Sequence, residues 1–174
     1  MKKIVTLVVL IAFFLPIISL GQKNNQLYID DTFPDSTFSK VMNYHKNTIA
    51  LSDFKNKLVV LDFFFTTCSV CIKSFPKLMQ YQKEMRDDLQ FVLVAHESAE
   101  KIQAYINKWE DQHKTKFTLP IITADTVLHQ WLPHRFETYY VWVNPTGRIV
   151  AQSSYVFMNP DIIRGYLKSS TFRE

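Results

Sequence analysis

The chain has 174 residues, of which 47% are hydrophobic and 21% are charged, and its formal net charge is +4 at pH 7. This length suits one domain with a sizeable core. Setting aside Lys2 and Lys3 leaves 18 of the 20 basic side chains against 16 acidic ones, and no long basic run is present, so the composition argues against a nucleic-acid partner.

The first 21 residues have the pattern of an export signal. A basic start precedes an apolar run of 17 residues over 4–20, and the small residues Ser19 and Gly21 stand where a signal is cleaved. An uncleaved membrane anchor is the alternative, because this run is at the low edge of a bilayer-spanning length. We therefore expect residues 1–21 to be a signal peptide or an N-terminal membrane anchor. The rest of the chain would then be periplasmic, or anchored and facing the periplasm.

After the first 21 residues we expect an extended arm over 22–35 and a folded domain over 36–174. In chain order the domain should contain short strands or a hairpin over 38–44 and 48–51, a turn or short helix over 52–57, a central strand over 58–65, a helix over 72–85, a buried strand over 90–95, a helix over 99–111, an irregular segment or short strand over 117–122, a short helix over 126–131, a hairpin of strands over 139–143 and 148–152, and a closing helix over 161–168. Pro76 should kink the helix that contains it. Ser98 can cap the next helix. This order predicts an α/β fold with a mixed central sheet and helices on both faces.

Cys68 and Cys71 are the only cysteines, and they lie between the expected central strand and the following helix. A Cys-x-x-Cys pair at such a junction is typical of a thiol–disulfide redox site. Cysteines three residues apart share one face of a first helical turn, which allows a disulfide. Unpaired backbone N–H groups and the helix dipole would favour the thiolate of Cys68. A purely structural disulfide is the weaker interpretation, because so short a loop removes little unfolded-state entropy.

Asp62 stands inside the apolar strand, six residues before Cys68. Desolvation would raise the pKa of a carboxyl buried there. A carboxyl group with a pKa nearer neutrality is a better general acid–base. The alternative is an aspartate that only bonds to neighbouring backbone.

Over about residues 48–152 the chain resembles the thioredoxin superfamily, and more closely its exported TlpA-like thiol–disulfide oxidoreductases. The resemblance rests on the Cys-x-x-Cys pair after an apolar strand, on the lead-in over 52–57, on Pro76 five residues after Cys71, and on the late hairpin over 144–150. It implies a thioredoxin-like fold in which Cys68 is the nucleophile and Cys71 resolves the mixed disulfide. It also implies that Asp62 helps to move the Cys71 proton.

Three positions depart from the family pattern. Thr67 stands where thioredoxins usually have tryptophan, Ser74 where many TlpA-like proteins have glutamate, and Thr138 where a cis-proline usually faces the cysteines. A cis bond before a non-proline residue costs about 3–4 kcal/mol, so the bond before Thr138 should be trans, or cis and strained. We expect the substrate groove to consist of Thr67, Ser69, Val70, Glu137 and Thr138.

The expected function is a thiol–disulfide oxidoreductase of the cell envelope that exchanges disulfides with protein substrates, more as a reductant than as an oxidant. Its partners would be protein thiols or disulfides of the envelope and a redox partner protein. We expect no metal, no cofactor and no nucleic acid, and membrane contact only if the N-terminal segment is uncleaved.

Three other functions stay open. A non-catalytic binding domain could use the aromatic residues Tyr139, Tyr140 and Trp142 as a groove. A metal-binding protein could combine the cysteines with one of three histidines, at positions 96, 129 and 134. A thiol peroxidase would have a threonine three residues before its reactive cysteine, where Phe65 stands here.

Overall fold

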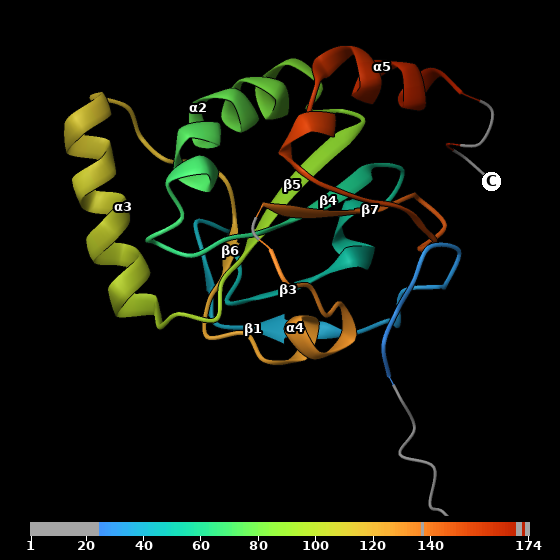
Figure 1. Ribbon diagram of the computed structural model, residues 1–174, viewed down its shortest axis with the longest axis horizontal. Coiled ribbons are helices and arrows are strands. Elements are labelled where there is room, and N and C mark those ends of the chain that lie inside the picture. Colours follow the sequence, from blue (N-terminus) through green and yellow to red (C-terminus); the bar gives the residue numbers. More distant parts are fainter. Residues whose placement is uncertain (1–24, 137, 170–171, 173–174) are drawn as a thin grey trace, which may run out of the picture.

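The computed structural model describes residues 25–136, 138–169 and 172. Its centre is a mixed sheet with the strand order β2-β6-β5-β4-β7-β8 (Figure 1). The strands are β2 (Val41–Met42), β4 (Leu58–Phe63), β5 (Leu89–Val94), β6 (Ile121–Ile122), β7 (Tyr139–Val143) and β8 (Ile149–Ser153). β4 runs parallel to β5 and β5 runs parallel to β6, whereas the other neighbours are antiparallel. The mixed central sheet expected from the sequence is therefore confirmed.

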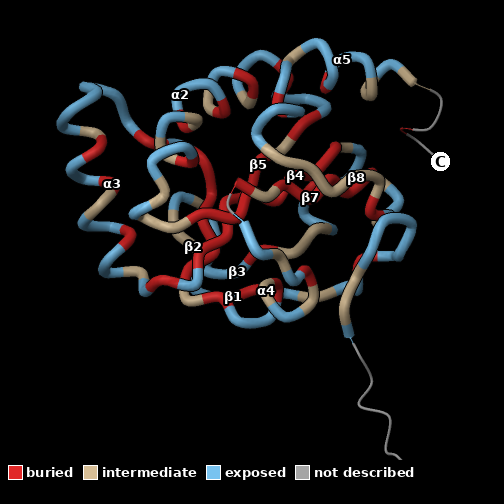
Figure 2. The backbone as a smooth tube through the Cα atoms, in the orientation of Figure 1, coloured by how far each residue is buried: buried red, intermediate tan, exposed pale blue. Residues whose placement is uncertain are grey.

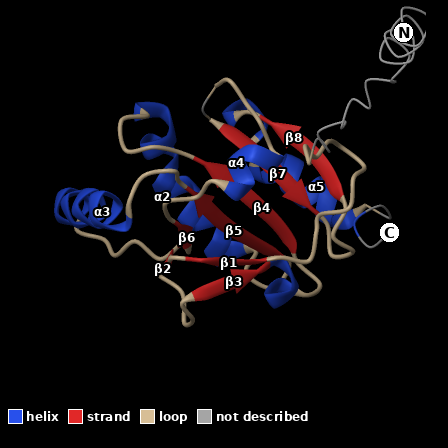
Figure 3. Ribbon diagram, turned by 90° about the horizontal axis from the view of Figure 1, so that it is seen from below, coloured by secondary structure: helices blue, strands red, loops and turns tan. Residues whose placement is uncertain are grey.

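The two faces of this sheet are covered by different elements. In Figure 1, α2 and α5 lie above the sheet and α3 lies at its left end, while β1, β3 and α4 lie below. The bounds are α2 (Ser69–Glu84), α3 (Ala99–His113), α4 (Val127–Trp131), α5 (Pro160–Lys168), β1 (Thr37–Ser39) and β3 (Thr48–Ala50), with 3-10 turns η1 (Leu51–Phe54) and η2 (Tyr155–Phe157). Figure 3, seen from below, shows β1 and β3 in front of the central strands. Helices on both faces are thus confirmed.

β4 is central because both of its faces are apolar, as the sequence predicted. All six of its residues are buried, and the central strands appear as red tube in Figure 2. Leu58 and Val60 belong to the core under α2, whereas Val59 and Leu61 belong to the core on the opposite face. Alternation along the strand therefore places Asp62 on the face that α2 covers.

Helix α2 begins earlier than the sequence suggested, at Ser69 rather than Ile72, because the Cys68 side chain caps its first turn. Its buried residues follow the helical period and are Cys71, Phe75, Leu78 and Tyr81. Pro76 lies inside the helix, which continues to Glu84. The kink expected at Pro76 stays a prediction.

The segment over 38–44 is not one strand. Lys40 has a left-handed backbone with φ of 60°, and the chain changes sheet there. Before it, Phe38 pairs with Ile49 in the β1–β3 hairpin; after it, Val41 pairs with Ile122 at the edge of the central sheet. The predicted hairpin is therefore confirmed only for its first part.

The turn between β7 and β8 is formed as predicted. The Oδ1 atom of Asn144 accepts hydrogen bonds from the backbone N–H groups of Thr146 and Arg148, at 3.1 and 2.8 Å. Gly147 adopts φ of 85°, a conformation that glycine reaches without steric cost. This turn joins two antiparallel strands and places β8 at the edge of the sheet.

The described part of the arm follows β8 and the turn before it. The Asp30 N–H donates to the Ile149 carbonyl at 2.8 Å, and the Phe33 N–H donates to the Gly147 carbonyl at 2.7 Å. Phe33 is buried and makes an edge contact with Trp131. The expected signal or anchor over 1–21 lies outside the described residues. No helix within the described ranges is long and apolar enough to cross a membrane.

Candidate active site

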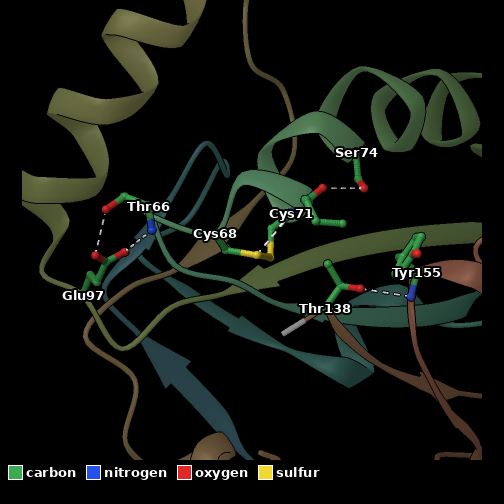
Figure 4. Close-up of a disulfide and its surroundings, with 8 residues drawn as sticks. Thr66, Cys68, Cys71, Ser74, Glu97, Thr138 and Tyr155 are labelled. Carbon is green, nitrogen blue, oxygen red and sulfur yellow. Dashed lines mark hydrogen bonds between the residues drawn. A yellow bond between two sulfur atoms is a disulfide. The ribbon is translucent and has the colours of Figure 1, made fainter. Parts of the chain in front are cut away.

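The two cysteines lie at the edge where the parallel strands end. Cys68 and Cys71 form a disulfide with a Cα–Cα distance of 5.3 Å (Figure 4). Cys71 lies in the first turn of α2 and is fully buried, whereas Cys68 precedes the helix and is half-buried. The pair predicted from the sequence is therefore brought together, and one sulfur is more accessible than the other.

Backbone hydrogen bonds fix Cys68 at the start of α2. Its N–H donates to the Phe65 carbonyl at 2.9 Å, and its carbonyl accepts from the Ile72 N–H at 3.1 Å. Its Sγ atom accepts from the Cys71 N–H at 3.3 Å. When the pair is reduced, such a donor and the positive end of the helix dipole favour a thiolate at this sulfur.

Asp62 lies in β4 opposite Tyr140 of β7, and neither side chain has solvent-exposed surface. Burial, together with the nearby charge of Asp62, raises the pKa of Tyr140 and outweighs the opposite effect of Ser74. The Tyr140 hydroxyl therefore keeps its proton at neutral pH. Asp62 lies in the layer beneath the helix that begins at the cysteines, and its expected proton-transfer role stays a prediction.

Glu97 is a site residue that the sequence reasoning missed. It is buried, and its carboxylate accepts hydrogen bonds from the N–H and the hydroxyl of Thr66, two residues before Cys68, at 2.7 and 2.8 Å (Figure 4). Burial would raise the pKa of this carboxyl, but hydrogen bonds from Lys101 and Thr66 outweigh it and lower the pKa. A signal was available, because Glu97 follows β5 at the sheet edge where open α/β sheets place their sites.

The residues expected to form the substrate groove differ in exposure. Thr67, Ser69 and Val70 are exposed around the disulfide. Thr138 lies in its surroundings but is only 5% exposed, and its Oγ1 atom accepts from the Tyr155 N–H at 3.0 Å (Figure 4). Glu137 and the bond that joins it to Thr138 lie outside the described residues. Three of the five residues are therefore accessible to a partner.

Two of the three histidines considered as metal ligands, His129 and His134, contact the ring of Phe63, and the third, His96, contacts His129. The ring of His129 lies 5.6 Å from each of the rings of His96 and His134, and its Nδ1 atom lies 2.7 Å from Asp125. Within the described ranges, no group of three or more His, Cys, Asp or Glu side chains is placed to hold a metal ion. His129 and Asp125 thus form a partly buried hydrogen-bonded pair at this end of the sheet.

The aromatic groove of the binding-domain alternative is not formed. Tyr140 and Trp142 are buried, at 0% and 3% exposure. The Trp142 indole N–H donates to the Ser153 hydroxyl at 3.1 Å, across the β7–β8 pair. These side chains belong to the core, and Tyr139 alone is partly exposed.

Comparison with known proteins agrees with this geometry. Residues 29–129, more than half of the chain, match the Redoxin family. A thioredoxin-like protein of Bacillus subtilis, YneN, is 35% identical over 72 residues, which span 41% of this chain and only 42% of that protein.

Solved structures share the fold. The thioredoxin domain of a thiol–disulfide oxidoreductase from Bacteroides vulgatus superposes with a TM-score of 0.62 at 22% identity, covering 82% of this chain and all of that one. The exposed lipoprotein thioredoxin of Streptococcus pneumoniae gives 0.58 at 26% identity, covering 78% of this chain and 98% of that one. The chain belongs to the Redoxin family, shares the thioredoxin-like fold and carries a Cys-x-x-Cys pair.

Proposed function

We propose that this protein reduces disulfides in protein clients of the cell envelope, with Cys68 as the nucleophile. The observation that carries this proposal is the Cys68–Cys71 disulfide, in which Cys68 is half-buried at a helix start and Cys71 is fully buried. Exposure suits an attacking thiolate that must reach a client. Burial suits a resolving thiol that reacts only with its neighbour.

The exchange proceeds in two displacements. The Cys68 thiolate attacks one sulfur of the client disulfide, a mixed disulfide forms, and the other client sulfur leaves as a thiolate. Cys71 then loses its proton and attacks the Cys68 sulfur, so that the second client sulfur leaves. Two electrons have passed to the client, and the Cys68–Cys71 disulfide remains. A redox partner protein must therefore reduce the pair again before the next cycle.

Asp62 is proposed to accept the Cys71 proton in the second displacement. It lies on the face of β4 that α2 covers, in the same core layer as Cys71. A carboxyl group shielded from water disfavours its charged form, which makes it able to exchange a proton near neutral pH. The proton then passes to solvent or to the departing client sulfur.

The proposed location rests on the N-terminal pattern. A basic start and an apolar run before small residues are typical of an export signal. The pneumococcal relative is described as an exposed lipoprotein. A cleaved signal would leave this protein in the periplasm, whereas an uncleaved one would anchor it there.

A redox titration of the Cys68–Cys71 couple against glutathione tests the direction. We expect a potential near about −270 mV, as in reductases, and a value near about −120 mV would instead make the protein an oxidant. An insulin-reduction assay tests the activity itself. Loss of insulin reduction in a fully reduced wild-type sample would contradict the proposal.

Trapping tests the two cysteine roles. Cys71→Ser should accumulate mixed disulfides with client proteins, because the first displacement proceeds and the second cannot. Cys68→Ser should abolish exchange. Comparable trapping by both variants, visible on non-reducing gels, would show that the roles are assigned wrongly.

A further inference from the structure

We propose that Glu97 is a positioning residue, which holds the loop before Cys68 and thereby sets the geometry of the nucleophile. The inference rests on the proposed function, because it assigns Glu97 a part in the same exchange. Glu97 touches neither sulfur in this arrangement and acts through Thr66. No residue pattern in the Cys-x-x-Cys motif itself points to it.

Both carboxylate oxygens of Glu97 accept hydrogen bonds from the loop before Cys68. Oε2 accepts from the Thr66 backbone N–H at 2.7 Å, and Oε1 accepts from the Thr66 hydroxyl at 2.8 Å. Oε1 also pairs with the Lys101 ammonium at 2.5 Å. The Glu97 side chain is only 7% exposed. Hydrogen bonds to a charged acceptor are stronger than neutral ones, and water competes little for a buried carboxylate.

Glu97 is itself held from the opposite side. Its carbonyl accepts the Ala124 N–H at 2.7 Å, from the loop after β6. Ser98, the next residue, caps α3, and Lys101 lies in the first turn of that helix. Figure 4 shows Glu97 reaching from this junction to Thr66. The loop before the disulfide is therefore tied to an element that is fixed independently of α2.

The contact with Thr66 acts close to the sulfur. Thr66 lies inside the turn that the Cys68 N–H closes on the Phe65 carbonyl at 2.9 Å. The same residue, Cys68, then caps α2 through its sulfur. Displacement of Thr66 would move this turn and weaken the Sγ contact with the Cys71 N–H. We expect the Cys68 thiolate to lose stabilisation as a result.

The Lys101 ammonium offsets the negative charge that Glu97 brings to the site. A buried carboxylate without a cation would repel a thiolate nearby. The Lys101 ammonium compensates this charge, so Glu97 can supply two strong acceptors without an unbalanced negative charge. Glu97 thus contributes geometry rather than net charge.

The chain offers a matched control at the other end of α3. Glu110 holds a loop in the same manner, since its carboxylate accepts the Phe117 N–H at 2.8 Å and pairs with Lys116 at 2.6 Å. That loop precedes β6 and does not lead to the cysteines. Loss of the Glu110 carboxylate should lower the stability of the fold without changing the reactivity of the Cys68 sulfur.

The test measures alkylation of reduced Cys68 by iodoacetamide against pH in the full exported chain, and the thiol–disulfide equilibrium with glutathione. In Glu97→Ala we expect the alkylation midpoint to move to higher pH by about one unit, which slows the reaction about tenfold below both midpoints. Glu97→Gln keeps an acceptor for the Thr66 N–H and should stay within about twofold of wild type. Glu110→Ala should also stay within about twofold, even where its stability falls.

Three outcomes would overturn the inference: a Glu97→Ala profile that coincides with wild type, an equal shift in Glu110→Ala, or an equal shift in Glu97→Gln. If Glu97→Ala does not fold, Thr66→Val replaces it, because this variant removes one of the two hydrogen bonds between Thr66 and Glu97. It should shift the alkylation midpoint of Cys68 by about half as much, and an unshifted profile would overturn the inference equally. Neither readout needs a protein client. A wild-type protein that fails to reduce insulin would contradict the proposed function while leaving the role of Glu97 decided by these profiles.

Discussion

Reduction of the Cys68–Cys71 disulfide should destabilise the fold. The disulfide joins residues three apart in sequence, so it closes a loop of four residues. The chain-entropy relation gives about 2 kcal/mol for so short a loop at 25 °C. For a domain of this size, that difference corresponds to about 4–8 °C in Tm. Stabilisation of the Cys68 thiolate in the reduced form acts in the opposite direction. It contributes about 1.4 kcal/mol for each pH unit by which folding lowers the pKa of the Cys68 thiol.

The same difference in unfolding free energy reports the direction of the redox reaction. A fold that is about 2 kcal/mol more stable when oxidised is a better reductant than the same Cys-x-x-Cys pair in an unfolded chain, by about 40 mV. Urea unfolding at pH 7, followed by tryptophan fluorescence with and without a phosphine reductant, measures it. The double variant Cys68→Ala/Cys71→Ala should show no effect of the reductant. A reduced form as stable as the oxidised form, or more stable, would refute the reasoning and favour an oxidant.

Three further results are expected. Asp62→Asn should slow resolution of the mixed disulfide by about 10²-fold or more while leaving formation of that species nearly unchanged, as quenched-flow gels would show; equal slowing of both steps would contradict a proton-transfer role. Phe75→Ala should lower the free energy of unfolding by about 3–5 kcal/mol, because Phe75 is fully buried, whereas Phe136→Ala, at a side chain that is 82% exposed, should change it by less than about 0.5 kcal/mol in the same urea titration. The pKa of Asp125 is lowered in the folded protein because hydrogen bonds from His129 and two backbone N–H groups outweigh the effect of burial. The stability that Asp125 contributes is therefore present above the pKa that its carboxyl has in the unfolded chain, and it is lost as the pH falls through the lower pKa of the folded protein. Asp125→Asn should therefore lower stability at pH 7, and acid titration should show the gap to wild type closing below about pH 4; a gap independent of pH would contradict this.

The elements that the sequence revealed are those with a local signal. The apolar run over 58–63 is buried on both sides, the Ser98 hydroxyl accepts the Lys101 N–H as a helix cap, and the turn over 144–147 closes a hairpin. Each depends on residues within a few positions of one another. Helix propensity, capping and turn chemistry act at that range, so the pattern is readable from the chain alone.

The parts that were missed depend on contacts between distant segments. A strand was expected over 38–44, but no local pattern shows that it divides at Lys40 or that β2 pairs with β6 about 80 positions later. The contact between Thr66 and Glu97 joins two loops that are 31 residues apart. The hydrogen bond to the Thr138 hydroxyl likewise comes from a distant residue, Tyr155, which follows β8. Such pairings become visible only when the sheet order is known.

The arm that follows β8 has a consequence for association between molecules. An exposed edge strand offers unpaired N–H and C=O groups to a second chain. Residues 30–33 occupy part of that edge, through the Asp30–Ile149 contacts and the bridge between Thr32 and Arg148. A shortened chain that begins at residue 36 would uncover this edge and also lose the buried Phe33 ring. We therefore expect the arm to protect the domain from edge-to-edge aggregation, and light scattering of the shortened chain should rise with concentration.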